Sequence, residues 1–471
     1  MEPTAGVGED EALRAGCAAG ETWAFDALAT RYGRLLSLVG ARVLDEIRGG
    51  PFDLRELASV RARAERRLED REIYARWRGR SLAPLVAALA RQEAESYAAN
   101  ETPIAAAPPF FPVPTVVSED PGALRQSLAR LEPIGALLVR LRLRGLDLAA
   151  VARPAARPAD AVVADLRRIA ERFAALDVPV AGAEAIWRVL LSVASIEERV
   201  AVALRTVGDA TFREDRRRLR GRWRALASAE LGQRRPVTPG PLATAEGVAT
   251  FVDGAPGASR TSGHLATCVR CADDVARLVL DMRAAEALGA TRELPEPLAL
   301  AAVSVATGRP RAAMALATDS EPGSLGEALL RLAMVGEALT GPEAPAPTAR
   351  ERSGVLEAPP IPSDEEAPLY ALEALVAGDA RTAARAIDDH AAKGTVGRRL
   401  RLLAAASGDD VALAQRLATE ILAAPSPDPG LALDARAVKA LPPDEALPPE
   451  MLAVRLRHAL PDAVRFTIAR S

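Results

Sequence analysis

Clustered prolines constrain this chain most, because they divide it into segments that must fold separately. Six of the 36 prolines fall within residues 101–122, ETPIAAAPPFFPVPTVVSEDPG. Proline at that density excludes both a helix interior and a central strand. Similar breaks occur at 231–242 and 341–368. The sequence therefore predicts linkers at 101–121 and 231–242 and a flexible loop at 341–368.

The segments between these breaks use mainly alanine, leucine, arginine and glutamate, and aromatic residues make up only 3% of the chain. These are good helix formers, whereas large sandwiches and barrels depend on aromatic and β-branched residues. We therefore expect an all-α, multi-domain protein. The predicted segments are a helical domain at 1–100, a second at 122–176, a helical extension at 177–232, a small unit at 240–285 and an Ala-rich helical domain at 290–471.

The Ala-rich domain contains two similar stretches, at 371–394 and 401–424. Each has the pattern of a helix, a Gly-Asp turn and a second helix. This resembles an α-solenoid of tetratricopeptide type. An irregular helical bundle fits the two copies equally well, and both interpretations stay open.

The charge and the cysteine content indicate the compartment and the kinds of partner to expect. The net charge is −3, yet the first 250 residues hold 37 arginines against 33 acidic residues, so a nucleic-acid role belongs to that half. The chain has only three cysteines, which fits a reducing compartment, and its acidic N-terminus does not resemble a signal peptide. It also contains no apolar run of 18 residues. We therefore expect a cytoplasmic protein with no membrane partner. No phosphate loop, nucleophile elbow or useful carboxylate pair occurs, so we expect no enzyme.

Residues 145–174, GLDLAAVARPAARPADAVVADLRRIAERFA, predict two helices across a tight turn. Asp147 is placed to cap the first helix, and Pro158 stands near the first position of the second. The apolar face of the second helix is expected to be Val162, Leu166 and Ile169. Such a pair is either a DNA-reading helix-turn-helix or an ordinary helical hairpin.

The wider context favours the first interpretation. Residues 122–176, including LARLEPIGALLVRLRLRGLDLAAVARPAARPADAVVADLRRIAERF, resemble region 4 of the extracytoplasmic-function sigma factors, a branch of the sigma-70 family of bacterial RNA polymerase. The segment ALRAGCAAGETWAFDALATRYGRLL (12–36), together with 53–68 and 77–92, resembles region 2 of the same family. Region 2, a Pro-rich linker and region 4 follow in the family's order.

The resemblance implies a set of partners and contact residues. Core RNA polymerase would contact Asp53 and Glu56, and promoter DNA would contact residues 77–95 and 158–172. The arginines expected to contact DNA, in or directly beside these segments, are Arg78, Arg80, Arg91, Arg157, Arg167, Arg168 and Arg172. The chain departs from the family where aromatic and basic residues usually stand, with Leu85, Ala87, Ala88, Val163 and Asp165 instead.

A second basic stretch, REDRRRLRGRWR at 213–224, holds seven arginines around Trp223. It is either a phosphate-binding helix or a solvated helix whose arginines pair with nearby acids.

The sequence H-x3-C-x2-C is formed by His264, Cys268 and Cys271. On one helix these residues share a face, and imidazole and thiolates together favour zinc. Residues 247–278 also resemble the zinc-binding anti-sigma domain, whose fourth ligand would fall near Leu242 here. The site is therefore incomplete, with three ligands.

Three interpretations of this site remain open. It is a metal-free zinc-type fold, a structural zinc site completed by water or by a carboxylate such as Asp253, or an open catalytic zinc.

Together these observations predict a sigma factor that directs transcription initiation and carries a fused anti-sigma-like regulatory module. The alternative is a sigma-derived protein-interaction module without promoter binding. The C-terminal helical domain would then bind a protein partner.

Overall fold

The computed structural model describes residues 5–48, 52–101, 131–174, 242–254, 261–317, 320–340, 366–389, 394–442 and 445–470. Within these ranges it leaves out residues 144, 145, 147, 153, 243, 262, 266, 267, 322, 409 and 448. The helical extension at 177–232, its arginine-rich stretch, and nearly all of the two linkers and the loop at 341–368 lie outside these residues.

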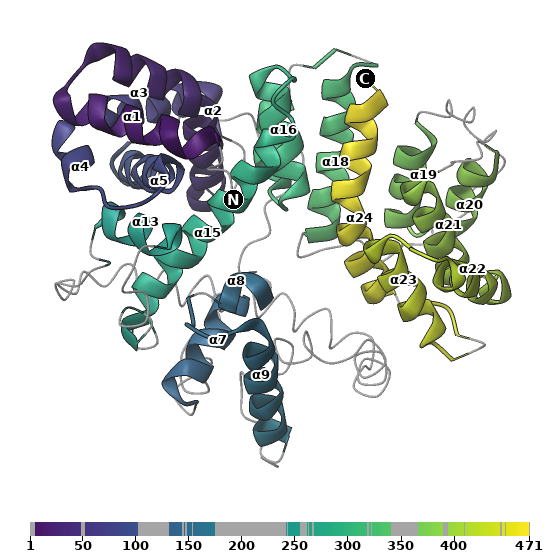
Figure 1. The fold of residues 1–471 in the computed structure, drawn as a ribbon. Coiled ribbons are helices and arrows are strands. Elements are labelled where there is room, and N and C mark those ends of the chain that lie inside the picture. The colour runs from purple at the N-terminus through teal and green to yellow at the C-terminus, as the bar shows by residue number, and fades with distance from the viewer. Residues whose placement is uncertain are drawn as a thin grey trace. The chain divides into compact units, whose positions relative to one another are not determined.

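The described residues form helices joined by turns, and no strand occurs among them, which confirms the all-α prediction (Figure 1). The chain divides into two compact units: the helices up to Gly289 belong to the first, and those from Glu296 onward belong to the second. None of the described helices has the length and apolar character needed to cross a membrane.

The first unit begins with a helical bundle made of α1 (Ala5–Ala19), α2 (Thr22–Arg48), α3 (Leu54–Leu68), α4 (Arg71–Arg76) and α5 (Leu82–Asn100). Helix α5 is the central element and packs against α2 and α3. Its start is fixed by the buried Asp10 of α1, whose carboxylate accepts hydrogen bonds from the Leu82 N–H (2.9 Å) and the Tyr32 hydroxyl (2.7 Å). Satisfying these donors with one buried carboxylate ties α1, α2 and α5 together.

Three shorter helices follow in the same unit: α7 (Pro133–Leu143), α8 (Leu148–Ala152) and α9 (Ala159–Ala174). The predicted helical pair corresponds to α8 and α9, and Pro158 directly precedes α9. The expected apolar face is confirmed, because Val162, Leu166 and Ile169 are all buried. Gly135 of α7 lets this face approach closely: a Cβ there would lie 3.0 Å from Ile169 Cδ1.

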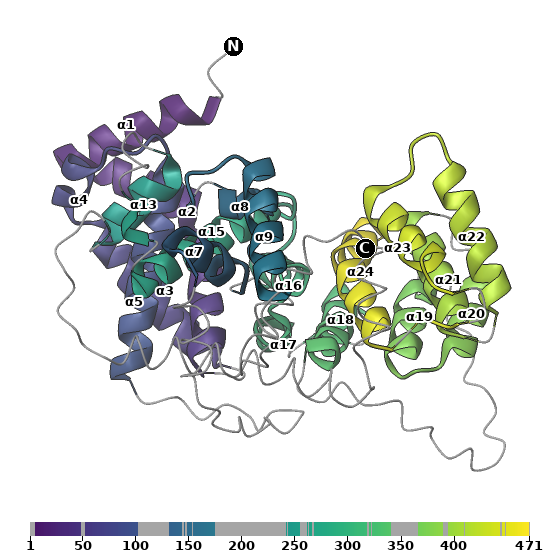
Figure 2. The same cartoon turned by 90° about the horizontal axis from the view of Figure 1, so that it is seen from below.

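The small unit predicted at 240–285 contributes α13 (Ala245–Asp253) and the long α15 (Val269–Gly289). Thr244 caps α13, and Gly254 ends it with a left-handed backbone (φ 90°), the conformation that glycine adopts without strain. Both helices pack against α5, and α15 also packs against α2 (Figure 2).

The second unit is an array of consecutive helices. They are α16 (Glu296–Ala306), α17 (Pro310–Ala317), α18 (Leu325–Thr340), α19 (Ala367–Val376), α20 (Ala380–Asp389), α21 (Thr395–Ser407), α22 (Val411–Ala423), α23 (Pro429–Lys439) and α24 (Pro449–Arg470). The first predicted Gly-Asp turn is confirmed, because Gly378 has a positive φ of 80° and Asp379 accepts the Thr382 N–H at 2.9 Å. At the second, Asp409 lies outside the described residues, and the next residue, Asp410, caps α22 by accepting the Leu413 N–H at 2.9 Å.

Candidate functional site

His264, Cys268 and Cys271 converge as predicted. Their ligand atoms all lie within 4.8 Å of one another, and His264 Nε2 is 3.2 Å from Cys271 Sγ. The local structure differs from one long helix, because α15 begins at Val269 with Cys268 at its N-cap. The Cys268 N–H still bonds to the His264 carbonyl at 2.8 Å, so the spacing of one helical turn is kept.

The three side chains offer the nitrogen and sulfur atoms that zinc prefers, and the distances between these atoms are close to those of a zinc site. Two sulfurs bound to one tetrahedral zinc stand about 3.8 Å apart, so a small closure of the site would place all three. Burial and the neighbouring Cys268 thiol raise the pKa of Cys271 to about 12, and metal binding would have to displace that proton.

No fourth ligand joins this group among the described residues. Leu242, at the place where the resembled domain has its fourth ligand, is a buried apolar side chain. The carboxylate of Asp253 accepts the backbone N–H of Arg80 and thereby links α13 to the turn before α5.

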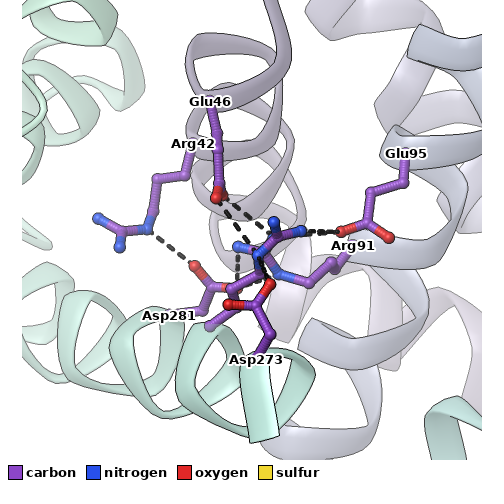
Figure 3. A network of polar contacts seen from close by, with 7 residues as sticks. Arg42, Glu46, Arg91, Glu95, Asp273 and Asp281 are labelled. Atoms are coloured by element: carbon purple, nitrogen blue, oxygen red, sulfur yellow. Dashed lines mark hydrogen bonds and ion pairs between the residues drawn. The ribbon is translucent and has the colours of Figure 1, made fainter. Parts of the chain in front are cut away.

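A buried network of charges joins α15 to the bundle, and Figure 3 shows its members converging from three helices. Asp281 of α15 is fully buried. Its two oxygens accept hydrogen bonds from Arg42 Nε of α2 and Arg91 Nε of α5, each at 2.8 Å. One carboxylate thus bridges two arginines from different helices.

Arg277 lies one turn before Asp281 on α15 and has the opposite charge, so its partners are carboxylates. Its guanidinium lies 3.3 Å from Glu46 Oε1 of α2, 3.2 Å from Glu95 Oε1 of α5 and 2.9 Å from Asp273 Oδ2 of its own helix. Because α15 offers both signs of charge to complementary partners, a shift of α15 along the bundle would bring like charges together. The network therefore fixes the register of α15.

Arg91, expected to contact DNA, is instead buried within this network and also pairs with Glu46 at 3.4 Å. Burial alone lowers the pKa of Arg91, but the carboxylates of Asp281 and Glu46 raise it above its ordinary value, so the side chain stays charged. Leu85, Ala87 and Ala88 are buried as well. Of the arginines expected to contact DNA in this region, Arg78 and Arg80 are exposed, in the turn before α5.

Asp53 and Glu56, expected to contact polymerase, form a capping box at the start of α3. The Asp53 carboxylate accepts the Arg55 N–H at 2.7 Å, and Glu56 is buried and accepts the Asp53 N–H. This accounts for both carboxylates locally. Nearby, Ile47 and Leu54 are large apolar side chains left exposed.

Two arginines of the α8–α9 region, Arg157 and Arg168, share one carboxylate. Asp165 lies 2.8 Å from exposed Arg168 and 3.9 Å from exposed Arg157, which stands in the turn before α9. Arg167 and Arg172 lie on α9, and their side chains are outside what the structure describes.

Sequence reasoning missed the network of Figure 3. A signal for it exists: Asp273, Arg277 and Asp281 recur every four residues, which places alternating charges along one face of α15. Such a face is usually solvent-exposed, so the spacing alone does not predict burial.

Asp274, beside the network, supplies a pH-dependent prediction. Burial, followed by the charges of Glu95 and Asp273, raises the pKa of Asp274 to about 6. The folded state therefore holds this proton more tightly than the unfolded state does. The associated stability is present at low pH and is lost as the pH rises toward 6.

We expect Asp274→Asn to be more stable than the parent by about 1–3 kcal/mol at pH 8 and nearly equal to it at about pH 3.5, below the unfolded-state pKa. Urea denaturation at the two pH values measures this difference. Glu286→Gln, on the exposed side of α15, is the control and should change neither value. A constant difference across the two pH values would contradict the assignment.

Comparisons of the chain with protein-family models, with curated protein sequences and with solved structures find no match.

Proposed function

We propose that the protein acts on bacterial RNA polymerase as an extracytoplasmic-function-type sigma factor, without enzymatic activity, and that its module at 240–285 covers the promoter-binding side of the bundle. Residues 1–100 are proposed to serve as region 2 and residues 122–176 as region 4. The observation that carries the proposal is the seating of α15 on α2 and α5 through Asp281, Arg42 and Arg91. The resemblance over residues 10–176 supports it.

Covering α5 has a direct consequence for DNA binding. Arg91 is buried and paired with carboxylates, so its guanidinium reaches a DNA phosphate only after α15 moves away. Arg78 and Arg80 stay exposed, although Arg78 donates to the Ala75 carbonyl at 2.9 Å, and the two would make the first phosphate contacts. The module would therefore regulate promoter binding by competition for α5.

The test is co-elution with core RNA polymerase on a sizing column. We expect the parent chain to bind polymerase, and the polymerase complex of Asp281→Asn, which weakens the contact of α15, to bind promoter DNA more tightly than the parent complex does. Glu286→Gln is the matched control. If neither form binds, and neither displaces another sigma factor, the polymerase role is excluded.

Asp165 supplies a DNA-binding prediction. Asp165→Asn removes one negative charge and releases Arg157 and Arg168 for phosphate contact. We expect tighter binding to duplex DNA, by about threefold to tenfold at low salt, and a salt dependence steeper by about one counterion.

Fluorescence anisotropy across a salt series measures both quantities. Asp160→Asn, at the exposed start of α9, is the control for loss of charge alone. Equal effects of the two substitutions would show that release of the arginines plays no part.

We also propose that His264, Cys268 and Cys271 bind one zinc ion, with water as the fourth ligand. Bound zinc would link the start of α15 to the turn before it and would stabilise the module. We expect about one zinc per chain, and Cys271→Ser to lose most of it, as measured by elemental analysis. Cys17→Ser, at a cysteine buried away from this group, is the control. A parent chain with little zinc would exclude the site.

A second candidate function is a protein-interaction module that no longer binds promoters. The burial of Arg91, Leu85, Ala87 and Ala88 favours it. Under this function Asp281→Asn would still bind polymerase or another protein, but DNA binding would show almost no salt dependence.

A further inference from the structure

The last helix, α24, occupies the inner side of the second unit. It contacts α16, α18, α19, α21 and α23, whereas α17, α20 and α22 have their main contacts with the helices before and after them (Figures 1 and 2). The helices that contact α24 thus line one side of it, and the other three helices of the array pack behind them.

The side of α24 that faces the helices lining it is a continuous apolar stripe. Its buried residues are Leu452, Leu456, Ala459, Leu460, Ala463 and Val464, which recur at helical spacing. Gly336 of α18 lies against the stripe, since a Cβ built there would be in ordinary van der Waals contact with Leu460 Cδ1 at 3.6 Å. The other side of α24 includes the exposed His458 and Arg465, so α24 lies in a groove and is not enclosed on all sides.

Two reciprocal ion pairs fix α24 in the groove. Arg399 of α21 reaches Asp462 of α24 at 2.8 Å and also donates to the His458 carbonyl at 2.9 Å. In return, Arg455 of α24 lies 3.4 Å from the fully buried Asp434 of α23. Asp434 also pairs with Arg399, so the groove keeps an internally paired Arg and Asp when α24 is absent.

Two features make α24 a poor occupant of this groove. Pro461 lies inside the helix, where its ring and its missing N–H weaken helix formation. Arg457 is half-buried, burial lowers its pKa to about 10, and no described residue accepts a hydrogen bond from its Nε. Both features raise the free energy of docked α24. A helix without the proline and without the half-buried arginine would dock in the groove more favourably.

We propose that the inner groove of the second unit is a binding site for an amphipathic helix of a partner protein, and that α24 is its internal competitor. The partner helix would carry leucines at the spacing of Leu452, Leu456 and Leu460. It would also carry an arginine and an aspartate seven positions apart, as Arg455 and Asp462 are, which places both on one side of a helix. This proposal is independent of the role at RNA polymerase.

The experiment uses the full chain with a protease site inserted between Pro443 and Asp444, so that cleavage frees residues 449–471 from their covalent link. A fluorescent peptide of residues 449–471 is the probe, and anisotropy reports its binding to the cleaved chain. We expect saturable binding that an excess of unlabelled peptide reverses.

Peptide variants test the recognition. Asp462→Ala and Arg455→Ala should each weaken binding about tenfold or more, since each leaves a buried groove charge with one partner fewer. Pro461→Ala and Arg457→Met should each strengthen it about fivefold or more. Arg465→Ala is the matched control. It removes only a surface pair with Asp462 (2.9 Å) from a side chain that is 77% exposed, so it should change binding less than twofold.

Three results would overturn the proposal. The first is loss of second-unit helicity on cleavage, which would make α24 an integral part of the fold. The second is a cleaved, folded chain that takes up no peptide. The third is an intact chain that forms dimers by exchanging α24, which would assign the groove to a second copy.

Discussion

Asp281→Asn should destabilise the first unit by about 3–5 kcal/mol, a value typical for removing one partner from a buried, hydrogen-bonded ion pair. The side chain is fully buried and is the common acceptor for Arg42 and Arg91. Asparagine keeps nearly the same shape, so the loss reports the charge and not a cavity. Arg91 would still pair with Glu46 and Glu95. Because these pairs keep its charge compensated, we expect the loss of stability not to exceed this range.

Chemical denaturation followed by tryptophan fluorescence measures the effect, since Trp77 is buried in the same unit and becomes exposed on unfolding. Hydrogen exchange should show faster opening of α15 than of α2. Glu286→Gln should leave the midpoint unchanged. An Asp281→Asn chain with the parent midpoint would mean that the network contributes no net stability.

Arg399→Ala should destabilise the second unit by a similar amount, about 3–5 kcal/mol. Arg399 is 2% exposed and is among the largest fully buried side chains in the described part of the chain. Its removal leaves a cavity and takes a partner from Asp434, Asp462 and the His458 carbonyl at the same time. The effect should reach α24, which depends on two of these contacts.

Hydrogen exchange of α21, α23 and α24 measures this loss within the second unit. Arg398→Ala is a close control, since Arg398 is the neighbouring residue on α21 and is exposed. Protection that falls equally in both variants would show that the cost comes from helix propensity and not from the buried ion pairs.

The sequence predicted well those features that depend on nearby residues. The apolar face of Val162, Leu166 and Ile169 follows from a spacing of three and four residues. The turns at Gly378 and Asp410 follow from turn and capping chemistry within four residues. The convergence of His264, Cys268 and Cys271 needs only the rise of one or two helical turns.

The sequence predicted poorly where a residue's role depends on a distant segment. Arg91 has the spacing of a surface arginine, yet its partner Asp281 lies 190 residues further along the chain.

By itself, then, the sequence determined the helical character of the chain and the local chemistry of its turns and of the His-Cys-Cys group. Hydrogen bonds and side-chain spacing within one or two turns fix these features. Only the tertiary structure decided which charged faces are buried. Whether Arg91, Asp281 or Arg399 faces water or a partner depends on which helices pack together, and that choice rests on the summed burial of apolar surface over the whole unit.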